Sequence, residues 1–498
     1  MKLPDTIIGR FCELASWHPD RLSLIAGEKR YTYHDLACLS SAYANCLRES
    51  FSLAPGDILV AWLNNGPEFV ASFLAAAASN AIFFPLNINL RPAELRWYLD
   101  RLPIRSVVTK QALLAPWEAL SDRLPPSRIV TVDHLLTGTD WLATSGIDSL
   151  TQNMAQVSPS QPAIYFSSSG STGAPKIVPR SHLNTIAGAE GTARALGLSD
   201  GLRFLSVVPF YHGNGFDNSL SLPLFSSCTL VLEPSFVPSR FSAALTGHQI
   251  QVLVGSPAIF ELLVQFQMDA HCLDSLQLCA SSGGPIAPQT SNEVRRRYGK
   301  AIRQVYGSTE TGVMAIEPPD GSPAAVPVPH VSLSVNDAEG RSVPQGEEGE
   351  IAARGPAVVS GYVNDPELTR NAFFDGCFRT GDRGRLDSAG HLTILGRIRP
   401  VINLSGTKVD AVEIENVLRQ LSDVVACRVF ADDGPQQQQV IKAVIAVREN
   451  STLTRAEVIA HCRQCLAEYK IPRIVEFVEA LPPDLAGKRQ VPWVRSEE

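Results

Sequence analysis

Short apolar runs alternate with helical patterns of apolar and polar residues along most of the chain. The apolar runs are residues 57–63, 107–109, 128–132, 204–208 and 228–232, and the helical patterns are residues 68–78, 239–248 and 257–267. An alternation of strands with helices is typical of βαβ units, whose strands pair in parallel. The pattern therefore predicts an α/β fold in which a large N-terminal domain contains doubly wound, largely parallel sheets.

The pattern changes twice in the second half of the chain. Residues 326–362 consist of short runs separated by glycines, which indicates a small β-rich subdomain. After residues 397–400 there follow a helix (412–421), strands (424–430 and 440–447), a helix (455–468) and a last strand (474–477). About a hundred residues are enough for a unit that folds alone. We therefore expect an N-terminal domain over residues 1–397 and a small α+β C-terminal domain over residues 398–498.

The composition is that of an ordinary globular protein. Of its 498 residues, 45% are hydrophobic and 19% are charged, and the formal net charge is −7. A net negative charge disfavours nucleic-acid binding, so we expect no nucleic-acid partner. Ten cysteines without regular spacing are typical of reduced thiols, and the N-terminus has no apolar signal-peptide core. We expect a cytoplasmic protein.

One stretch, residues 69–90, carries no charged side chain. Pro85 interrupts it, and it contains several serines and asparagines. A transmembrane helix needs about 20 consecutive apolar residues. We therefore expect a buried helix followed by a buried strand rather than a membrane span.

The most informative motif is Tyr-Phe-Ser-Ser-Ser-Gly-Ser-Thr-Gly-Ala-Pro-Lys at residues 165–176, which continues an apolar, strand-like run. Its glycines let backbone N–H groups approach an anion, its hydroxyls add donors, and its lysine adds a charge that suits phosphate. The G-x-x-x-x-G-K-[ST] spacing of a Walker loop is absent. The alternative is a flexible Ser/Gly linker. We favour a triphosphate-binding loop, because linkers seldom leave an apolar strand so abruptly or end at a lysine.

A second motif, Tyr-Gly-Ser-Thr-Glu-Thr at residues 306–311, follows a predicted strand at residues 301–305. A hydroxyl in a turn at a strand end is suited to contact a phosphate. Mg²⁺ on a nucleotide usually takes only one or two protein carboxylates, so Glu310 alone is sufficient to bind it. The alternative is a plain turn with a solvated glutamate.

A third motif, Arg-Thr-Gly-Asp at residues 379–382, precedes a predicted strand–turn–strand at residues 384–395. An aspartate fixed in a tight glycine turn is able to accept hydrogen bonds from ribose hydroxyls. The alternative is an Asx-turn.

Two further segments follow predicted strands. Ser-Gly-Gly-Pro at residues 282–285 lies between a strand and a helix, where doubly wound sheets bind ligands. His212, in Pro-Phe-Tyr-His-Gly-Asn-Gly at residues 209–215, follows the run at residues 204–208. We expect His212 to be a pocket wall rather than an acid or base.

Taken in their order along the chain, these motifs resemble those of the adenylate-forming superfamily. This superfamily comprises acyl- and aryl-CoA ligases, adenylation domains of peptide synthetases, and firefly-type luciferases. The resemblance extends from Gly-Glu-Lys-Arg-Tyr-Thr-Tyr at residues 27–33 to Gly487-Lys488, nearly the whole chain. It implies two steps: a carboxylate attacks the α-phosphate of Mg-ATP to give acyl-AMP and pyrophosphate, and a thiol then displaces AMP. It also implies that the C-terminal domain moves about a hinge between the steps.

The resemblance also assigns roles in binding ATP. The residues expected to hold the β- and γ-phosphates are Ser168, Ser169, Gly170, Ser171, Thr172, Gly173 and Lys176. Thr309 would contact phosphate beside Gly307 and Ser308, with Glu310 on Mg²⁺. The residues expected at adenine are Tyr306, which would stack on it, and Gly283, Gly284 and Pro285, and those expected at the ribose are Asp382 and Arg397.

The C-terminal domain would supply the residue for bond formation. Lys488 would bridge the attacking carboxylate and the α-phosphate, where charge builds up in the transition state. With Lys176, Thr309 and Glu310 it makes up the predicted catalytic set. Arg399 takes the hinge position, and Gly406 lies in the strand expected to border the thiol tunnel.

For the carboxylic acid substrate, the sequence predicts a chemical class rather than one compound. His212 takes the place of the pocket gate of CoA ligases, and Asn214 and Gly215 follow it in the substrate-binding segment. Amino-acid-activating domains bind the α-ammonium with an aspartate where this chain has Asn214, and Asp217 is three residues away from that position. Because a neutral amide compensates a buried ammonium poorly, we expect an acid without an α-amino group.

The acceptor thiol stays open between two alternatives. Pro400 and Asn403 depart from the residues that the superfamily usually has near the hinge, and Cys377 replaces a usual aromatic residue. We expect CoA as the acceptor, and the alternative is a freestanding adenylation enzyme that loads a carrier-protein phosphopantetheine, with an amino acid among its candidate substrates. A non-catalytic nucleotide-binding protein is disfavoured because Lys488, Glu310 and Asp382 are present. We expect a monomer or a homodimer.

Overall fold

The structure is a computed structural model. The residues that it describes are 5–132, 146–151, 157–168, 175–233, 237–266, 268–398, 402–404, 407–433, 439–448, 451–478 and 481. The chain divides into two compact units. The first unit comprises Met1–Ile88, Tyr98–Ser168 and Lys176–Arg399, and the second comprises Asn89–Trp97, Ser169–Pro175 and Pro400–Glu498.

The largest sheet of the first unit has nine strands. In spatial order they are β15 (Val326–Pro327), β14 (Gly312–Ile316), β13 (Ile302–Ser308), β12 (Leu278–Ser282), β11 (Val252–Gly255), β9 (Arg203–Ser206), β10 (Thr229–Leu232), β1 (Leu22–Ala26) and β2 (Lys29–Thr32). The strands from β13 to β1 pair in parallel, and the outer ones pair antiparallel. Phe204 and Leu205, successive residues of β9, belong to two different hydrophobic clusters. The sheet is therefore covered on both faces, which confirms the doubly wound fold.

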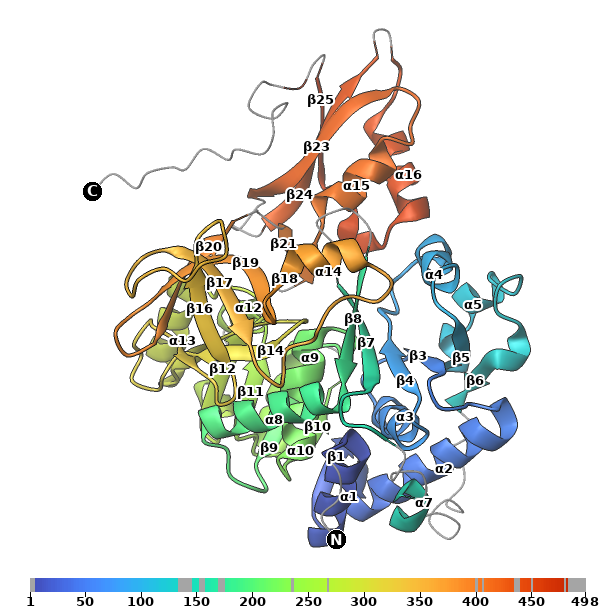
Figure 1. The fold of residues 1–498 in the computed structure, drawn as a ribbon, viewed down its shortest axis with the longest axis vertical. Coiled ribbons are helices and arrows are strands. Elements are labelled where there is room, and N and C mark those ends of the chain that lie inside the picture. The colour runs from blue at the N-terminus through green and yellow to red at the C-terminus, as the bar shows by residue number, and fades with distance from the viewer. Residues whose placement is uncertain are drawn as a thin grey trace. The chain divides into compact units, whose positions relative to one another are not determined.

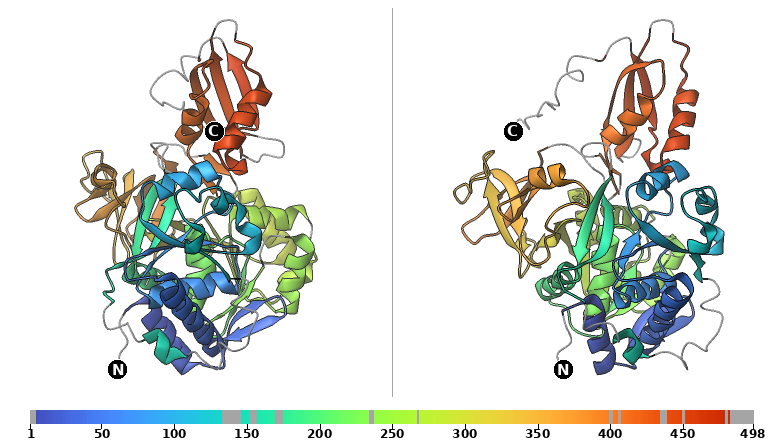
Figure 2. Two further views of the ribbon diagram at one scale, coloured as in Figure 1. Left: turned by 90° about the vertical axis from the view of Figure 1, so that its right-hand side faces the viewer. Right: turned by 45° about the vertical axis from the view of Figure 1, so that its right-hand side comes forward.

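Helices pack on both faces of this sheet (Figures 1 and 2). One face contacts α11 (Pro238–Gly247), α12 (Pro257–Gln265) and α13 (Pro288–Tyr298), whose apolar residues share one cluster with the sheet. The other face contacts α8 (His182–Leu196), which begins at a capping box in which the Ser181 hydroxyl accepts a hydrogen bond from the Asn184 N–H. That cap fixes the point where strand β8 (Lys176–Ser181) turns into helix α8.

A six-stranded sheet forms the other part of the same core. In spatial order it consists of β6 (Ile129–Thr131), β5 (Ile104–Thr109), β3 (Ile58–Trp62), β4 (Ile82–Pro85), β7 (Pro162–Ser168) and β8 (Lys176–Ser181). All neighbours are parallel except β7 and β8. The uncharged stretch predicted to be a buried helix and strand forms α3 (Pro67–Ala78), every residue of which is buried, and β4. Among the described residues, no helix is long and apolar enough to cross a membrane.

A smaller antiparallel sheet completes the first unit. Its strands are β16 (Ser332–Asn336), β17 (Gly349–Arg354), β18 (Phe373–Phe374), β19 (Cys377–Leu386) and β20 (Leu392–Arg397), and α14 (Pro366–Ala372) precedes β18. This sheet is the predicted β-rich subdomain, and it extends beyond the predicted residues 326–362. The Arg-Thr-Gly-Asp motif lies inside β19 rather than before a strand, so that part of the prediction is wrong.

The second unit has an α+β fold, as predicted. It contains the hairpin β21 (Ile402–Leu404) and β22 (Thr407–Val409), a sheet of β23 (Val424–Asp433), β24 (Gln439–Val447) and β25 (Ile474–Val478), and helices α15 (Ala411–Leu418) and α16 (Arg455–Cys465). Apolar side chains of both helices and of the sheet form one cluster. Cys462 and Cys465 lie on α16, and all ten cysteines are free thiols.

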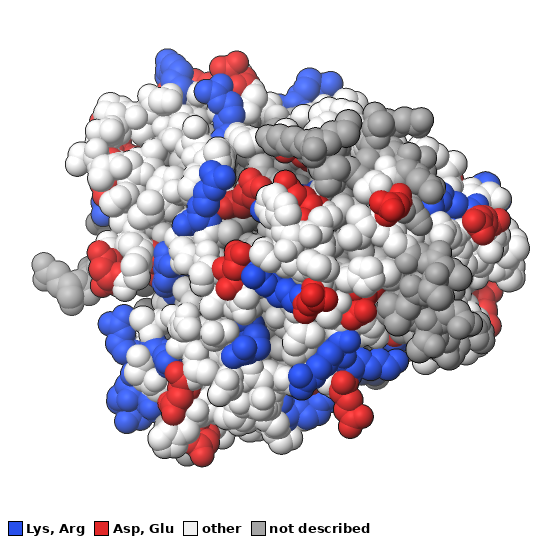
Figure 3. Space-filling view, turned by 90° about the horizontal axis from the view of Figure 1, so that it is seen from below, with Lys and Arg blue, Asp and Glu red and all other residues white. Residues whose placement is uncertain are grey.

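Basic and acidic side chains are interspersed on the face seen in Figure 3, with large uncharged areas between them. No single-sign patch dominates that face of the molecule.

Candidate active site

Eight of the predicted site residues lie outside the described part of the chain. They are Ser169, Gly170, Ser171, Thr172, Gly173, Arg399, Gly406 and Lys488. Their roles stay predictions. The other predicted residues all belong to the first unit, and most of them lie near the carboxyl ends of β9, β12 and β13 or in the small sheet.

The two described ends of the phosphate loop lie side by side. Ser168 ends β7 and Lys176 begins β8, and the two residues are direct partners in the antiparallel ladder. The strand pair thus holds Ser168 and Lys176 next to each other. The Lys176 Nζ atom lies 5.2 Å from the centroid of the Tyr362 ring, a distance at which an ammonium group interacts with an aromatic face.

The Tyr-Gly-Ser-Thr-Glu-Thr motif lies partly within a strand. Residues 306–308 are the last three of β13, and Thr309 and Glu310 form the turn into β14. The prediction that the motif follows the strand is thus wrong by three residues. Gly307 allows β13 and β14 to lie close together, because a Cβ at this position would lie 2.3 Å from the Gly312 carbonyl oxygen. The Ser308 N–H donates to the Thr311 hydroxyl oxygen at 3.2 Å, which closes the turn.

Tyr362 holds the carboxylate predicted to bind Mg²⁺. Its hydroxyl donates to the Glu310 Oε1 atom at 2.9 Å, and both side chains are buried. Burial and the neighbouring carboxylate raise the pKa of Tyr362, so its hydroxyl keeps the proton that it donates. A carboxylate that accepts one hydrogen bond has further lone pairs for a hard cation. No group of three or more His, Cys, Asp or Glu side chains in the described ranges could hold a metal, so a metal here would rely on Glu310 and the nucleotide.

Asp382 joins two other residues that we predicted to bind the nucleoside. The Tyr306 hydroxyl donates to its Oδ2 atom at 2.7 Å, and the Arg397 Nε atom lies 2.7 Å from its Oδ1 atom. Burial, followed by the charge of Asp382, raises the pKa of Tyr306, which keeps this hydroxyl protonated. Asp382 reaches this position because Gly381 has a φ of +72° and the β19 ladder shifts register next to it. A β-bulge, rather than the predicted turn, aims the carboxylate.

The glycine segment after β12 lies against the predicted acid-binding segment. The Gln304 Nε2 atom donates to the carbonyl oxygens of Ser281 and Gly284 at 3.0 and 2.9 Å, and Gly283 has a φ of +92°. The Asn214 Nδ2 atom donates to the Ser282 carbonyl oxygen at 3.1 Å. The segment that includes Gly283, Gly284 and Pro285 is thus placed beside Asn214.

Residues 212–218, which we call the acid-side segment, form a short helix that passes into a π-helical turn. His212 caps α9 (Gly213–Phe216), and η5 (Asp217–Ser221) follows directly. Burial lowers the pKa of His212 to about 4, so its ring is neutral at pH 7. Gly215 has no room for a side chain, because a Cβ there would lie 2.1 Å from the Pro209 carbonyl oxygen. His212 is thus a neutral residue at the start of this segment.

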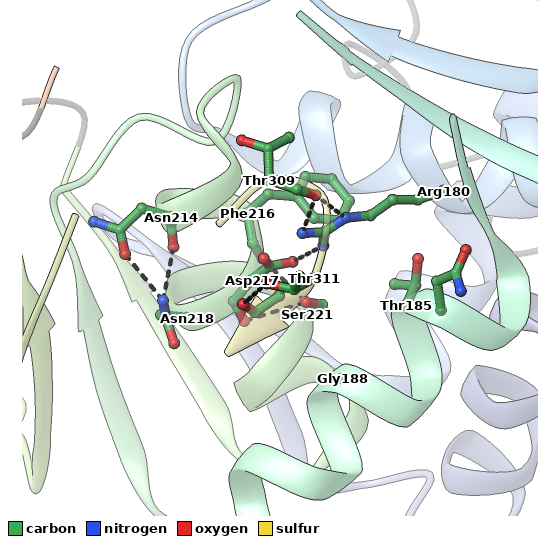
Figure 4. Close-up of polar contacts among 12 residues, drawn as sticks. Arg180, Thr185, Gly188, Asn214, Phe216, Asp217, Asn218, Ser221, Thr309 and Thr311 are labelled. Atoms are coloured by element: carbon green, nitrogen blue, oxygen red, sulfur yellow. Dashed lines mark hydrogen bonds and ion pairs between the residues drawn. The ribbon is translucent and has the colours of Figure 1, made fainter. Parts of the chain in front are cut away.

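The amide side chains of the acid-side segment bind each other (Figure 4). The Asn218 Nδ2 atom donates to the Asn214 Oδ1 atom at 2.9 Å. Asn214 uses its own Nδ2 atom on Ser282, so both of its polar atoms have protein partners. This pair carries no formal charge.

The buried Arg180 and the partly buried Asp217 form an ion pair that no sequence motif predicted (Figure 4). The Arg180 NH1 atom lies 2.5 Å from the Asp217 Oδ1 atom, and the Arg180 side chain is 2% exposed. Its Nε and NH2 atoms donate to the Thr309 carbonyl oxygen at 2.8 and 2.7 Å. A single arginine in the run Ile177-Val178-Pro179-Arg180 has no motif around it. Its only sequence signal is a charge within an apolar strand.

Family models match most of the chain. The model described as AMP-binding enzyme matches residues 11–363, and the model described as AMP-binding enzyme C-terminal domain matches residues 413–488. The chain is 29% identical over 495 residues to indoleacetate–CoA ligase of Aromatoleum aromaticum, with 96% of each chain covered. It is 30% identical over 500 residues to the medium-chain fatty-acid–CoA ligase of Escherichia coli, covering 95% of this chain and 87% of the relative.

Solved structures share the fold. The o-succinylbenzoate–CoA synthetase of Bacillus subtilis matches with a TM-score of 0.84 at 23% identity, covering 96% of this chain and 98% of the other. An amide bond synthetase of Marinactinospora thermotolerans matches with a TM-score of 0.83 at 23% identity, covering 96% and 97%. At 23% identity, these two solved structures show that the chain shares their fold and nothing more. The family models and the curated relatives show that the chain belongs to the AMP-binding enzyme family, in the acyl-CoA ligase branch of the adenylate-forming superfamily, and is an AMP-forming acid–thiol ligase.

Proposed function

We propose that this protein activates a carboxylic acid without an α-amino group as acyl-AMP and transfers the acyl group to CoA. One observation carries the nucleotide half of this proposal: the side chains of Tyr306 and Arg397 both contact the Asp382 carboxylate. A buried carboxylate between an aromatic ring and a guanidinium group suits a nucleoside, whose ribose hydroxyls donate and whose base stacks. The named relatives support CoA as the acceptor.

In the first step, a carboxylate oxygen of the acid attacks the α-phosphorus of ATP. The new bond joins that oxygen to phosphorus, and the bond to the β-phosphate oxygen breaks, so pyrophosphate leaves. Lys176 and Thr309 would hold the phosphates, and Lys488 would stabilise the charge at the α-phosphate. Mg²⁺, when bound, neutralises phosphate charge, and Glu310, oriented by Tyr362, would hold it.

In the second step, the thiol sulfur attacks the acyl carbon and AMP leaves with the oxygen that came from the acid. The thiol proton passes to AMP or solvent. We propose that residues 398–498 act as a mobile part, with Arg399 at its hinge, Gly406 at the thiol tunnel and Lys488 as its catalytic residue.

The acid-side segment supports an acid without an α-amino group. An α-ammonium needs a carboxylate that is not already paired. The Asp217 carboxylate has a buried guanidinium as its partner, and Asn214 and Asn218 are neutral amides that bind each other. Among the described residues of the acid-side segment, Asp217 is the one acidic side chain.

The experiment that tests the proposal is a panel of carboxylic acids read by the exchange of labelled pyrophosphate into ATP. Aryl, acyl and α-amino acids are compared, and then CoA and a pantetheinylated carrier protein are compared as acceptors. We expect exchange with aryl or acyl acids and release of AMP with CoA. Exchange only with amino acids would overturn the acid class, and acylation of the carrier alone would favour the freestanding carrier-loading enzyme.

A further inference from the structure

Arg180 contacts the turn that carries the phosphate-binding residues. This residue lies on β8, four positions after Lys176, and its side chain is almost fully buried. In addition to its two bonds to the Thr309 carbonyl oxygen, its NH2 atom donates to the Ser308 carbonyl oxygen at 3.4 Å. Its guanidinium carbon lies 5.2 Å from the centroid of the Phe166 ring. These partners of the guanidinium group all belong to the first unit, and Asp217, Ser308 and Thr309 are partly exposed.

Packing alone does not require a charge at this position. Arginine stays protonated in proteins, and removing its charge from water costs several kcal/mol, so an apolar residue often fills such a space as well or better. Arg180 differs from an apolar side chain in one respect: its planar fork binds a carbonyl oxygen through two N–H groups at once.

The bonded carbonyl determines the orientation of the neighbouring peptide group. A trans peptide bond is planar, so its N–H points away from its C=O. Because the Thr309 carbonyl points at Arg180, the N–H of Glu310 points in the opposite direction. Arg180 therefore fixes the peptide between Thr309 and Glu310, the residues proposed to contact phosphate and Mg²⁺.

Asp217 fixes Arg180 in turn, from the acid-side segment (Figure 4). The same segment touches the turn a second time, because a Cβ at Gly213 would lie 3.3 Å from the Thr309 hydroxyl oxygen. The turn and the acid-side segment thus meet through one ion pair and one close glycine contact.

We propose that Arg180, held by Asp217, is a positioning residue that sets the Thr309–Glu310 turn for Mg-ATP. This inference rests on the proposed function, because Thr309 and Glu310 have their roles only there. Arg180 does not touch the substrate; it acts through the backbone of the turn. The pair also explains why Asp217 is unavailable to a substrate ammonium.

The test compares Arg180→Lys and Asp217→Asn with the wild-type enzyme. A lysine lacks the fork that holds the Thr309 carbonyl, and an asparagine keeps the shape of Asp217 but removes the counter-charge. We expect the half-saturating concentration of Mg-ATP in pyrophosphate exchange to rise about tenfold or more in Arg180→Lys and by a smaller factor in Asp217→Asn. The half-saturating concentration of the acid changes less than twofold.

Arg203→Lys is the matched control. The Arg203 Nε atom donates to the His248 carbonyl oxygen at 2.6 Å and its NH2 atom donates to the Gln249 carbonyl oxygen at 3.1 Å, in the same unit but away from the turn. A role limited to stability would lower the melting temperature of all these variants without changing the Mg-ATP requirement. Binding of Mg-ATP is also measured by calorimetry without acid, which makes the result independent of the acid's identity.

Each outcome decides the inference. If Arg180→Lys does not fold, Asp217→Asn decides alone. Folded variants that bind Mg-ATP within twofold of the wild type, or an Arg203→Lys variant that loses as much, would overturn the positioning role. If the wild type binds Mg-ATP but none of the tested acids supports pyrophosphate exchange, the proposed function fails. If the wild type exchanges pyrophosphate and the variants show the same Mg-ATP requirement as the wild type, only this inference is refuted.

Discussion

The proposed nucleotide side of the site, around Glu310 and Asp382, and the acid-side segment, which is proposed to face the acid, are held by different interactions. On the nucleotide side, two buried carboxylates, Glu310 and Asp382, each accept a hydrogen bond from a tyrosine hydroxyl. On the acid side, two asparagines bind each other, and the single carboxylate, Asp217, is neutralised by a buried arginine. Asp382 is paired with Arg397 just as Asp217 is paired with Arg180, so the two sides differ at Glu310, whose described side-chain contact is a tyrosine hydroxyl rather than a basic group.

The proposed nucleotide side would serve a reaction step that is the same for every acid, whereas the acid-side segment would select the acid. Transfer of the adenylyl group requires fixed charge whatever acid is used, and both Glu310 and Asp382 are held in place by tyrosine hydroxyls. A neutral acid pocket selects by shape and by hydrogen bonds instead. The comparison therefore predicts that a change at Glu310 alters the rate and the need for metal, whereas a change at Asn214 alters which acid is accepted.

The largest effect is expected for Glu310→Gln. This change removes the charge proposed to hold Mg²⁺ but leaves an amide oxygen that still accepts the Tyr362 hydroxyl. We expect pyrophosphate exchange to fall about 10²–10³-fold, the size of effect seen when one oriented group is removed from a transition state. The measurement is the exchange rate over a Mg²⁺ titration. The control, Glu233→Gln, alters a surface ion pair with Arg240; exchange in Glu310→Gln as fast as in this control contradicts the assignment.

Tyr362→Phe tests the orientation of Glu310 rather than its charge. Loss of one hydrogen bond to a charged group costs about 1.5–3 kcal/mol, so we expect the Mg²⁺ concentration that gives half-maximal exchange to rise about tenfold or more. Tyr33→Phe is the matched control, because the Tyr33 hydroxyl is also buried and donates to the Leu224 carbonyl oxygen at 2.9 Å. An equal change in the Mg²⁺ requirement of both variants would show that Tyr362 has no special role.

Asn214→Asp tests whether the neutral acid-side segment determines the class of acid. The substitution places a carboxylate where the wild type has a neutral amide. We expect the ratio of exchange with an α-amino acid to exchange with its deaminated analogue to rise about three- to tenfold, because the ammonium gains a counter-charge. Asn364→Asp, at an exposed position of the same unit, serves as the control. A lower ratio, or an equal gain in the control, would count against a neutral acid side.

The smallest effect concerns pH. Burial lowers the pKa of His182 and of His212 from 6.5 to about 4. Between these values the unfolded chain binds more protons than the folded one, so the free energy of unfolding falls as the pH drops from 6.5 towards 4. The melting temperature of the wild type should decrease over this range, and the decrease should be smaller in His212→Gln. Equal slopes for the two proteins would mean that His212 is not neutral in the fold.

The sequence predicted which residues come together on the proposed nucleotide side better than it predicted their local structure. The resemblance to the superfamily placed Tyr306, Asp382 and Arg397 at one nucleoside, and their side chains do meet. Gly307 and Gly381 suggested turns at two motifs. In the structure, Gly307 allows two strands to lie close together, and Gly381 allows a β-bulge. A glycine allows several backbone conformations, and pairing with distant strands decides among them.

The supporting residues were not predictable from local patterns. Tyr362 follows a glycine in the connection between β17 and α14, and Arg180 interrupts an apolar strand; neither lies in a polar cluster. Each becomes informative only when the fold brings it to the Thr309–Glu310 turn, 52 residues away for Tyr362 and 129 for Arg180. Contacts at such separations depend on topology, which single residues do not reveal.

The central claim is that the acid is activated by bond formation between its own carboxylate oxygen and the α-phosphorus of ATP. The most direct test labels both carboxylate oxygens of an accepted acid with oxygen-18 and analyses the products by mass spectrometry after transfer to CoA. Attack by the acid's oxygen on the α-phosphorus predicts that AMP carries one labelled oxygen and that pyrophosphate carries none. Unlabelled AMP, or formation of ADP with label in inorganic phosphate, would contradict it.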